Sequence, residues 1–144
     1  MFDKLHNPLA LAGRLLMAWL FVHAGIDKLT GFSGAVAYIS SADMPMPHAG
    51  AAVALVVEIV AGIALIVGYH TRIAALVLAV FTLAATLMFH NYLALPADQQ
   101  IVPQLLFNKN IAVVGGLLTL AAWGAGAWSL DGRNKVVSPS RASA

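Results

Sequence analysis

Cysteine is absent from the 144 residues of this chain. The chain therefore forms no disulfide of its own, performs no thiol–disulfide exchange and binds no zinc ion or iron–sulfur cluster through thiolates. Charged residues are also few, at 10% of the chain, against about 25% in an average soluble domain. The net charge is only +2, and the cationic residues form no basic patch of the kind that binds nucleic acid.

Most of the chain is apolar: 60% of its residues are hydrophobic, and its mean hydropathy is +0.84. About 20 apolar residues in a helix cross the hydrocarbon core of a bilayer, and lipid satisfies no free backbone polar group. The sequence therefore predicts an all-α integral membrane protein, an antiparallel bundle of four transmembrane helices. The four apolar runs are residues 8–26, 49–68, 71–89 and 105–123.

The segments between these runs differ in length. Tyr69 and His70 alone separate the second and third runs, so those two helices must be antiparallel neighbours. Residues 27–48 form a long connection whose apolar spacing predicts a short interfacial helix between the first two spans. We expect residues 1–130 to form one membrane domain and residues 131–144 a disordered cytoplasmic tail.

Four spans place both termini on one side of the membrane, and the cationic residues divide unequally between the two sides. Cytoplasmic loops of membrane proteins carry the excess of Lys and Arg. The sequence therefore predicts a multi-pass protein of a bacterial inner membrane with both termini in the cytoplasm. The terminal side holds Lys4, Arg14, Arg72, Arg133, Lys135 and Arg141, and the other side holds Lys28 and Lys109.

Glu58 lies in the middle of the second apolar run. A charge in the centre of a bilayer costs from about 2.5 to more than 10 kcal/mol, so it is rarely kept without a partner or a task. Ala54, Ala61 and Gly62 share its helical face, and small residues let helices pack closely. We expect Glu58 to point into the bundle.

Arg14, in the first run, lies at nearly the same expected depth as Glu58. The sequence therefore predicts an intramembrane Arg14–Glu58 ion pair. One interpretation is a buried pair that fixes the register of two helices. The other is a proton or ligand site at Glu58.

A second polar group is expected in the outward half of the membrane, where Lys28, His90, Asn108 and Lys109 could surround a shallow pocket. These side chains could hydrogen-bond or protonate a quinone oxygen. They could equally be ordinary interface residues, with lysines extending toward water and Asn108 capping a helix.

A metal site is not expected. The five histidines are scattered over both sides, no two of them lie three or four residues apart, and no phosphate loop, dinucleotide motif or nucleophile–base motif occurs. The sequence thus identifies no catalytic residue. The histidines are His6, His23, His48, His70 and His90.

An ordered set of motifs across all four runs resembles the DoxX family. The resemblance implies a small four-helix membrane protein and a link to membrane redox complexes, because the family name comes from a thiosulfate:quinone oxidoreductase subunit. It implies no catalytic residues. The motifs are Gly13–Arg14, the Phe21, Gly25 and Lys28 set, Pro45, Glu58, Gly68 to Arg72, Phe89–His90 and the run from Lys109 to Gly116.

Three functions stay open at this point. The first is an accessory or subunit of a quinone-linked membrane redox system, with electrons supplied by a partner protein. The second is a non-enzymatic scaffold or assembly factor. The third is a small-solute or proton carrier, which would require a homo-oligomer because four short helices rarely enclose a path alone.

Overall fold

The computed structural model describes the backbone of residues 2–137 and the side chains of residues 5–133, and helices account for most of this part of the chain. No strand occurs within this part of the chain. The elements in order are α1 (Phe2–Thr30), α2 (Phe32–Ser41), α3 (Pro47–Val67), α4 (Thr71–Phe89), the 3-10 turns η1 (Tyr92–Ala94) and η2 (Ala97–Gln99), α5 (Ile101–Trp123) and α6 (Leu130–Val137).

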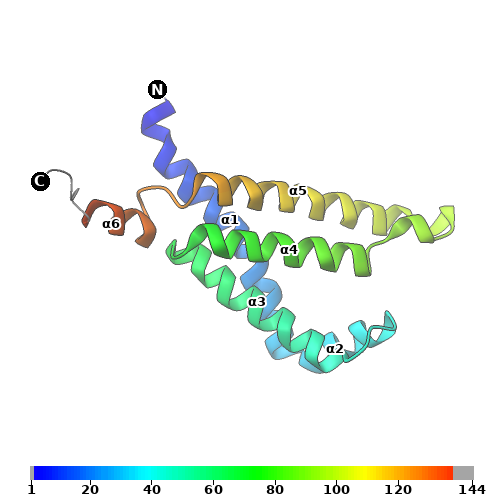
Figure 1. Ribbon diagram of the computed structural model, residues 1–144. Coiled ribbons are helices and arrows are strands. Elements are labelled where there is room, and N and C mark those ends of the chain that lie inside the picture. Colours follow the sequence, from blue (N-terminus) through cyan, green and yellow to red (C-terminus); the bar gives the residue numbers. More distant parts are fainter. Residues whose placement is uncertain (1, 138–144) are drawn as a thin grey trace, which may run out of the picture.

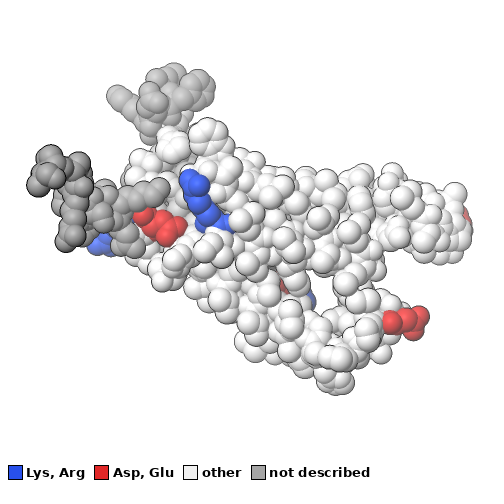
Figure 2. All heavy atoms as spheres, viewed as in Figure 1, with Lys and Arg blue, Asp and Glu red and all other residues white. Residues whose placement is uncertain are grey.

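Helices α1, α3, α4 and α5 are each long and apolar enough to cross a membrane. Many of their large apolar side chains are exposed, including Trp19, Val53 and Val80, as expected where lipid rather than protein covers them. Figure 2 shows almost no Lys, Arg, Asp or Glu along the middle of the visible face. The predicted all-α bundle of four transmembrane helices is therefore confirmed.

The four spanning helices form two closely packed pairs. Helix α1 packs on α3 and α4 packs on α5, while α3 and α4 join the two pairs and α1 barely contacts α5. In Figure 1, α4 and α5 run side by side, whereas α3 diverges from α4 toward the end that carries α2. The bundle is thus closed at one end and splayed at the other.

The α3–α4 turn shows why the closed end is tight. Gly68 ends α3 with φ +68°, and His70 precedes α4 with φ +45°. The left-handed conformation at Gly68 reverses the chain without steric cost, because glycine has no Cβ. The predicted tight turn and the antiparallel arrangement of α3 and α4 follow from it.

The predicted short helix between the first two spans is α2, which packs against α3 and, less extensively, α1. None of its residues is buried. Its position at the membrane interface stays a prediction.

The expectation of a disordered tail from Asp131 onward is wrong for its first part, where α6 forms instead. The amide of Asp131 donates to the carbonyl oxygen of Gly68 at 2.9 Å, and its carboxylate accepts amide bonds from His70 and Thr71. These bonds dock the start of α6 on the α3–α4 turn. Residues 138–144 of the expected tail lie outside the described part of the chain.

Figure 1 places the N-terminal end of α1 and helix α6 at the same end of the molecule, beside the α3–α4 turn. This arrangement agrees with an even number of spans. Helix α2 and the connection between α4 and α5 lie at the opposite end.

Candidate functional site

Glu58 is buried, with only 6% of its surface exposed, and it projects from α3 toward α1. Its neighbours on that face, Ala54, Ala61 and Gly62, are buried with it. The prediction that Glu58 faces the bundle from a stripe of small residues is therefore confirmed. A carboxylate in this position needs a partner from a neighbouring helix.

Lys28 is that partner. Its Nζ atom lies 3.0 Å from Oε1 and 2.9 Å from Oε2 of Glu58, so one ammonium contacts both oxygens of one carboxylate. The Lys28 side chain is 26% exposed and the Glu58 side chain 7%. Nζ also donates to the carbonyl oxygen of Ala24, one turn earlier on α1, at 3.4 Å. The ion pair is thus anchored on α1 and buried on the α3 side.

The predicted Arg14–Glu58 pair is wrong. Arg14 is 2% exposed and donates instead to two backbone carbonyl oxygens beyond α5, from Nη1 to Ala125 at 3.0 Å and from Nη2 to Trp128 at 2.9 Å. A planar guanidinium reaches two acceptors at once, and here it fixes the segment that joins α5 to α6.

The register of α1 against α3 explains the error. Close contacts of glycines fix that register, because Gly25 faces Ile59 and Gly62 faces Val22. In this antiparallel register, Gly68 lies beside Arg14. Gly68 is ten residues, or about 15 Å, along α3 from Glu58. The ends of the apolar runs in the sequence suggested that Arg14 and Glu58 lie at nearly the same depth in the membrane. In the structure, Arg14 instead lies near the end of α3 that carries Gly68.

A pocket of about 620 Å³ opens from the Lys28–Glu58 pair into the splayed end of the bundle. Figure 2 shows basic and acidic atoms inside the hollow between the α4 side and the α2–α3 side, surrounded by uncharged surface. The acidic and basic side chains of the lining are Asp27, Lys28, Glu58 and His90. The apolar lining includes Ala24, Ala35, Ile39, Met44, Pro45, Ala54, Phe81, Ala84, Ala85, Met88 and Phe89.

Two aromatic side chains of the pocket lining stack on each other. Tyr38 of α2 stacks on Phe89 at the end of α4, with ring centroids 5.3 Å apart and the ring planes inclined by 28°. Helices α2 and α4 make few other contacts. The stack therefore bridges the two halves of the bundle at the point where they diverge.

The predicted outward pocket is half present. Lys28 and His90 line the pocket, from α1 and from the residue that follows α4. Asn108 and Lys109 do not line it, and both are exposed on α5. Helix α5 packs on α4 and not on α2, so its polar residues lie outside the walls of the pocket.

The sequence alone did not reveal the apolar wall that α2 and the Met44–Pro45 segment supply. The available signal was the set of small residues at Ala24, Ala35 and Ala54, since small side chains leave space between helices that do not close together. Only the divergence of α3 from α4 turns that space into a pocket.

Among the residues whose side chains are described, no group of three His, Asp or Glu is arranged to hold a metal ion. The pocket can instead offer an ammonium, a carboxylate and an imidazole to a ligand, within walls that suit an apolar body. Such a combination is typical of sites for amphipathic small molecules.

Comparison with known proteins settles the family. The DoxX family profile matches residues 9–91, which span α1 through α4 and contain both members of the ion pair. The chain belongs to the DoxX family. The α5 motif from Lys109 to Gly116 lies outside the matched residues.

Two similar chains come from Escherichia coli strain K12. The inner membrane protein YphA is 35% identical over 132 residues, which cover 92% of this chain and 94% of YphA. The inner membrane protein YqjF is 37% identical over 128 residues, which cover 89% of this chain and 93% of YqjF. No protein of solved structure shows significant similarity to the chain.

Proposed function

We propose that this DoxX-family protein binds a membrane quinone in the Lys28–Glu58 pocket and serves a quinone-linked redox system of the inner membrane as an accessory or subunit. The inner-membrane setting is supported by the four apolar spans and by the descriptions of the relatives YphA and YqjF. The quinone is supported by the chemistry of the pocket.

A single observation carries the proposal: an ion pair with a buried carboxylate lies in the wall of a mainly apolar pocket in the membrane-spanning bundle. A quinone ring is apolar across its faces and carries carbonyl oxygens that accept hydrogen bonds. The Lys28 ammonium has three donors; two of them face the Glu58 oxygens, and the third makes only a long bond of 3.4 Å to the Ala24 carbonyl oxygen. Exchange of that long bond would let one donor reach a carbonyl oxygen of the ring.

His90 gives the pocket a second polar group, on the far wall from the ion pair. A quinone becomes a quinol by taking up electrons and protons, and an imidazole is the side chain best suited to exchange protons near neutral pH. In this proposal His90 exchanges protons with the bound ring, while a redox partner protein supplies the electrons.

The test begins with protein purified from membranes in mild detergent, followed by lipid extraction and quinone quantification. We expect co-purified quinone with the wild type and at least a several-fold loss with Lys28→Met. Lys109→Met is the matched control, because Lys109 carries the same side chain on α5 outside the pocket. Equal quinone content in wild type and Lys28→Met would refute the proposal.

A scaffold or assembly role is the second candidate, and it is supported by the way the ion pair joins α1 to α3 where glycines bring these helices close. In that case Glu58→Gln would lower protein level or partner recovery after membrane crosslinking, without affecting quinol oxidation. The homo-oligomeric carrier remains a hypothesis that solute or proton uptake into proteoliposomes would test.

The proposed orientation places both termini in the cytoplasm and the pocket in the outward half of the membrane. It is supported by the distribution of Lys and Arg and by the position of the start of α1 and of helix α6 beside the α3–α4 turn. A reporter fused after residue 144 should show cytoplasmic activity, and one inserted near Asp98, between α4 and α5, should show periplasmic activity.

A further inference from the structure

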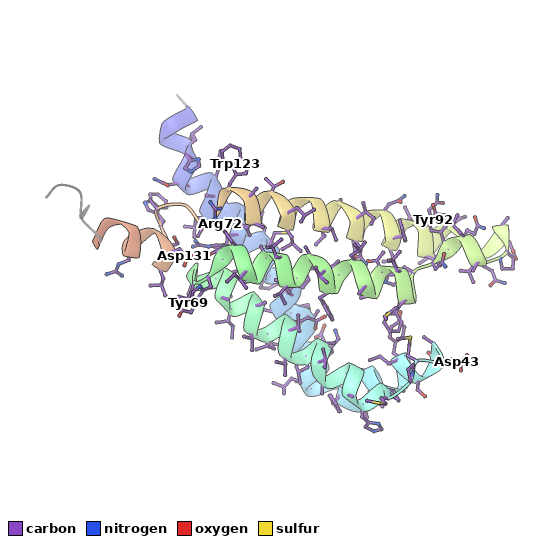
Figure 3. All side chains as sticks on the ribbon, in the orientation of Figure 1. Asp43, Tyr69, Arg72, Tyr92, Trp123 and Asp131 are labelled. Atoms are coloured by element: carbon purple, nitrogen blue, oxygen red, sulfur yellow. The ribbon has the colours of Figure 1, made fainter. Side chains whose placement is uncertain are left out.

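A second pocket, of about 590 Å³, lies at the opposite end of the bundle from the Lys28–Glu58 pair. Four parts of the chain form its walls: the start of α1, the α3–α4 turn, the end of α5 with the following linker, and the start of α6. Figure 3 shows Arg72, Trp123 and Asp131 together at this end. The side chains most relevant to binding are His6, His70, Arg72, Trp123 and Asp131.

We propose that this pocket binds the phosphate of an anionic phospholipid at the cytoplasmic edge of the membrane, with Arg72 as the principal contact. The site does not involve the quinone pocket and stands whether or not a quinone binds there. Three features support it: the cationic side chain of Arg72, the fixed backbone of the linker after α5, and the exposed apolar surface beside the pocket.

Arg72 is available to a ligand. Among the side chains described, residues 5–133, it donates no hydrogen bond and forms no ion pair, whereas Arg14 donates to two backbone carbonyl oxygens. Arg72 is exposed at the start of α4 and lines the pocket. An arginine fork matches the oxygens of a phosphate better than any other side chain.

The linker after α5 positions this arginine. Gly124 has φ +83°, and a Cβ at that residue would lie 3.3 Å from Nε of Arg72, so the guanidinium stem rests against the glycine backbone. The linker is itself held by Arg14 and by Asn7, whose Oδ1 accepts from the amide of Ala127 at 3.1 Å. The wall beside Arg72 is therefore fixed rather than free to close over it.

Asp131 is the acidic member of the lining and would oppose an anion. Each of its oxygens accepts an amide bond of 2.9 Å, one from His70 and one from Thr71. These bonds direct both carboxylate oxygens onto the amides of His70 and Thr71, which are then not free to bind an anion. The anion is therefore left to Arg72, with His6 and His70 as further donors.

The surroundings favour a lipid over free phosphate as the source. Trp123 is 77% exposed and Ile73 is 61% exposed, and both line the pocket at the ends of spanning helices. Tryptophan is enriched at the headgroup level of membranes, and the cytoplasmic leaflet is rich in anionic lipids. A headgroup in the pocket would leave its acyl chains against this exposed apolar surface.

Native mass spectrometry of the full chain tests the proposal, with dioleoyl phosphatidylglycerol and dioleoyl phosphatidylcholine as competing probes. We expect the wild type to retain phosphatidylglycerol preferentially and Arg72→Gln to lose that retention roughly fivefold. Arg133→Gln is the matched control, since Arg133 is an exposed arginine of α6 outside the pocket lining. Unchanged retention in Arg72→Gln would overturn the proposal.

Two further measurements use the wild type alone, so they do not depend on whether a substituted protein folds. Hydrogen exchange of residues 124–132 should slow with phosphatidylglycerol but not with phosphatidylcholine, and equal exchange with both lipids would refute the site. Inorganic phosphate at millimolar concentration should leave phosphatidylglycerol bound. Displacement by phosphate would show that free phosphate is the ligand and would overturn the lipid assignment.

Discussion

The Lys28 ammonium of α1 contacts both carboxylate oxygens of Glu58 on α3, at 3.0 and 2.9 Å, within the membrane-spanning part of the bundle. The two residues are separated by 30 positions in the sequence. Their contact joins two helices that antiparallel packing already holds close, and it places a charged pair at the boundary of an apolar pocket.

Removing one member of this pair should cost more than removing both. Lys28→Met leaves the Glu58 carboxylate without a cation, and we expect a loss of about 1–3 kcal/mol in the free energy of unfolding, since Lys28 keeps some exposure. Adding Glu58→Gln should recover part of that loss. Thermal unfolding in detergent of the two single variants and the double variant measures the coupling. Strictly additive effects would contradict the pairing.

Arg14→Lys should loosen the segment between α5 and α6. A lysine carries one compact ammonium and cannot replace a fork that donates to both the Ala125 and Trp128 carbonyls. We expect a loss of about 2 kcal/mol in stability and faster hydrogen exchange of residues 124–129. Arg133→Lys, on exposed α6, is the control and should leave exchange in that segment unchanged. Equal exchange in Arg14→Lys and wild type would contradict the role of Arg14.

The contribution of Asp131 to stability should depend on pH. Burial by itself would raise the pKa of this carboxyl, but the hydrogen bonds from Thr71 and His70 outweigh it and lower the pKa below its ordinary value. A carboxyl whose pKa is lower in the folded state stabilises the fold above its unfolded pKa of about 3.9. That stabilisation is lost as the pH falls through the lower folded value.

We therefore expect the difference in unfolding temperature between wild type and Asp131→Asn to be largest near neutral pH and to shrink below about pH 4. Unfolding followed by circular dichroism from pH 3 to pH 7 measures this difference. Asp98→Asn, in the exposed turn η2, serves as the control. A difference that stays constant across this range would contradict the assigned hydrogen bonds.

Glycines in the α1–α3 contact should not tolerate a methyl group. A Cβ at Gly62 would lie 2.7 Å from Cγ2 of Val22, so we expect Gly62→Ala to lower stability by about 1–3 kcal/mol. Gly115→Ala is the matched control, because nothing lies within 4 Å of a Cβ there. That variant should be neutral or stabilising by up to about 1 kcal/mol, since alanine favours a helix over glycine. The same cost at both positions would argue against the close approach.

Hydropathy and spacing were enough to predict the spanning helices, and Glu58 with its small neighbours was enough to predict an inward-facing carboxylate. Both predictions depend on local patterns, because the length of an apolar run and the face of a helix can be read from neighbouring residues. The tight turn at Tyr69 and His70 likewise depends on a connection too short to allow another arrangement.

Local sequence patterns could not predict which cation pairs with Glu58. Arg14 and Lys28 lie on the same helix, and the choice between them depends on how α1 slides along α3, which the contacts at Gly25 and Gly62 decide. The exclusion of Asn108 and Lys109 from the pocket has the same origin, since it depends on α5 packing against α4.

The sequence by itself therefore determined that lipid surrounds this chain, how many helices cross it and that one acidic group lies among them, because burial in a membrane acts on each segment separately. The tertiary structure decided which cation that acidic group meets, where the helices diverge and where α6 docks. Those outcomes arise from contacts between segments distant in the chain, whose register no single helix specifies.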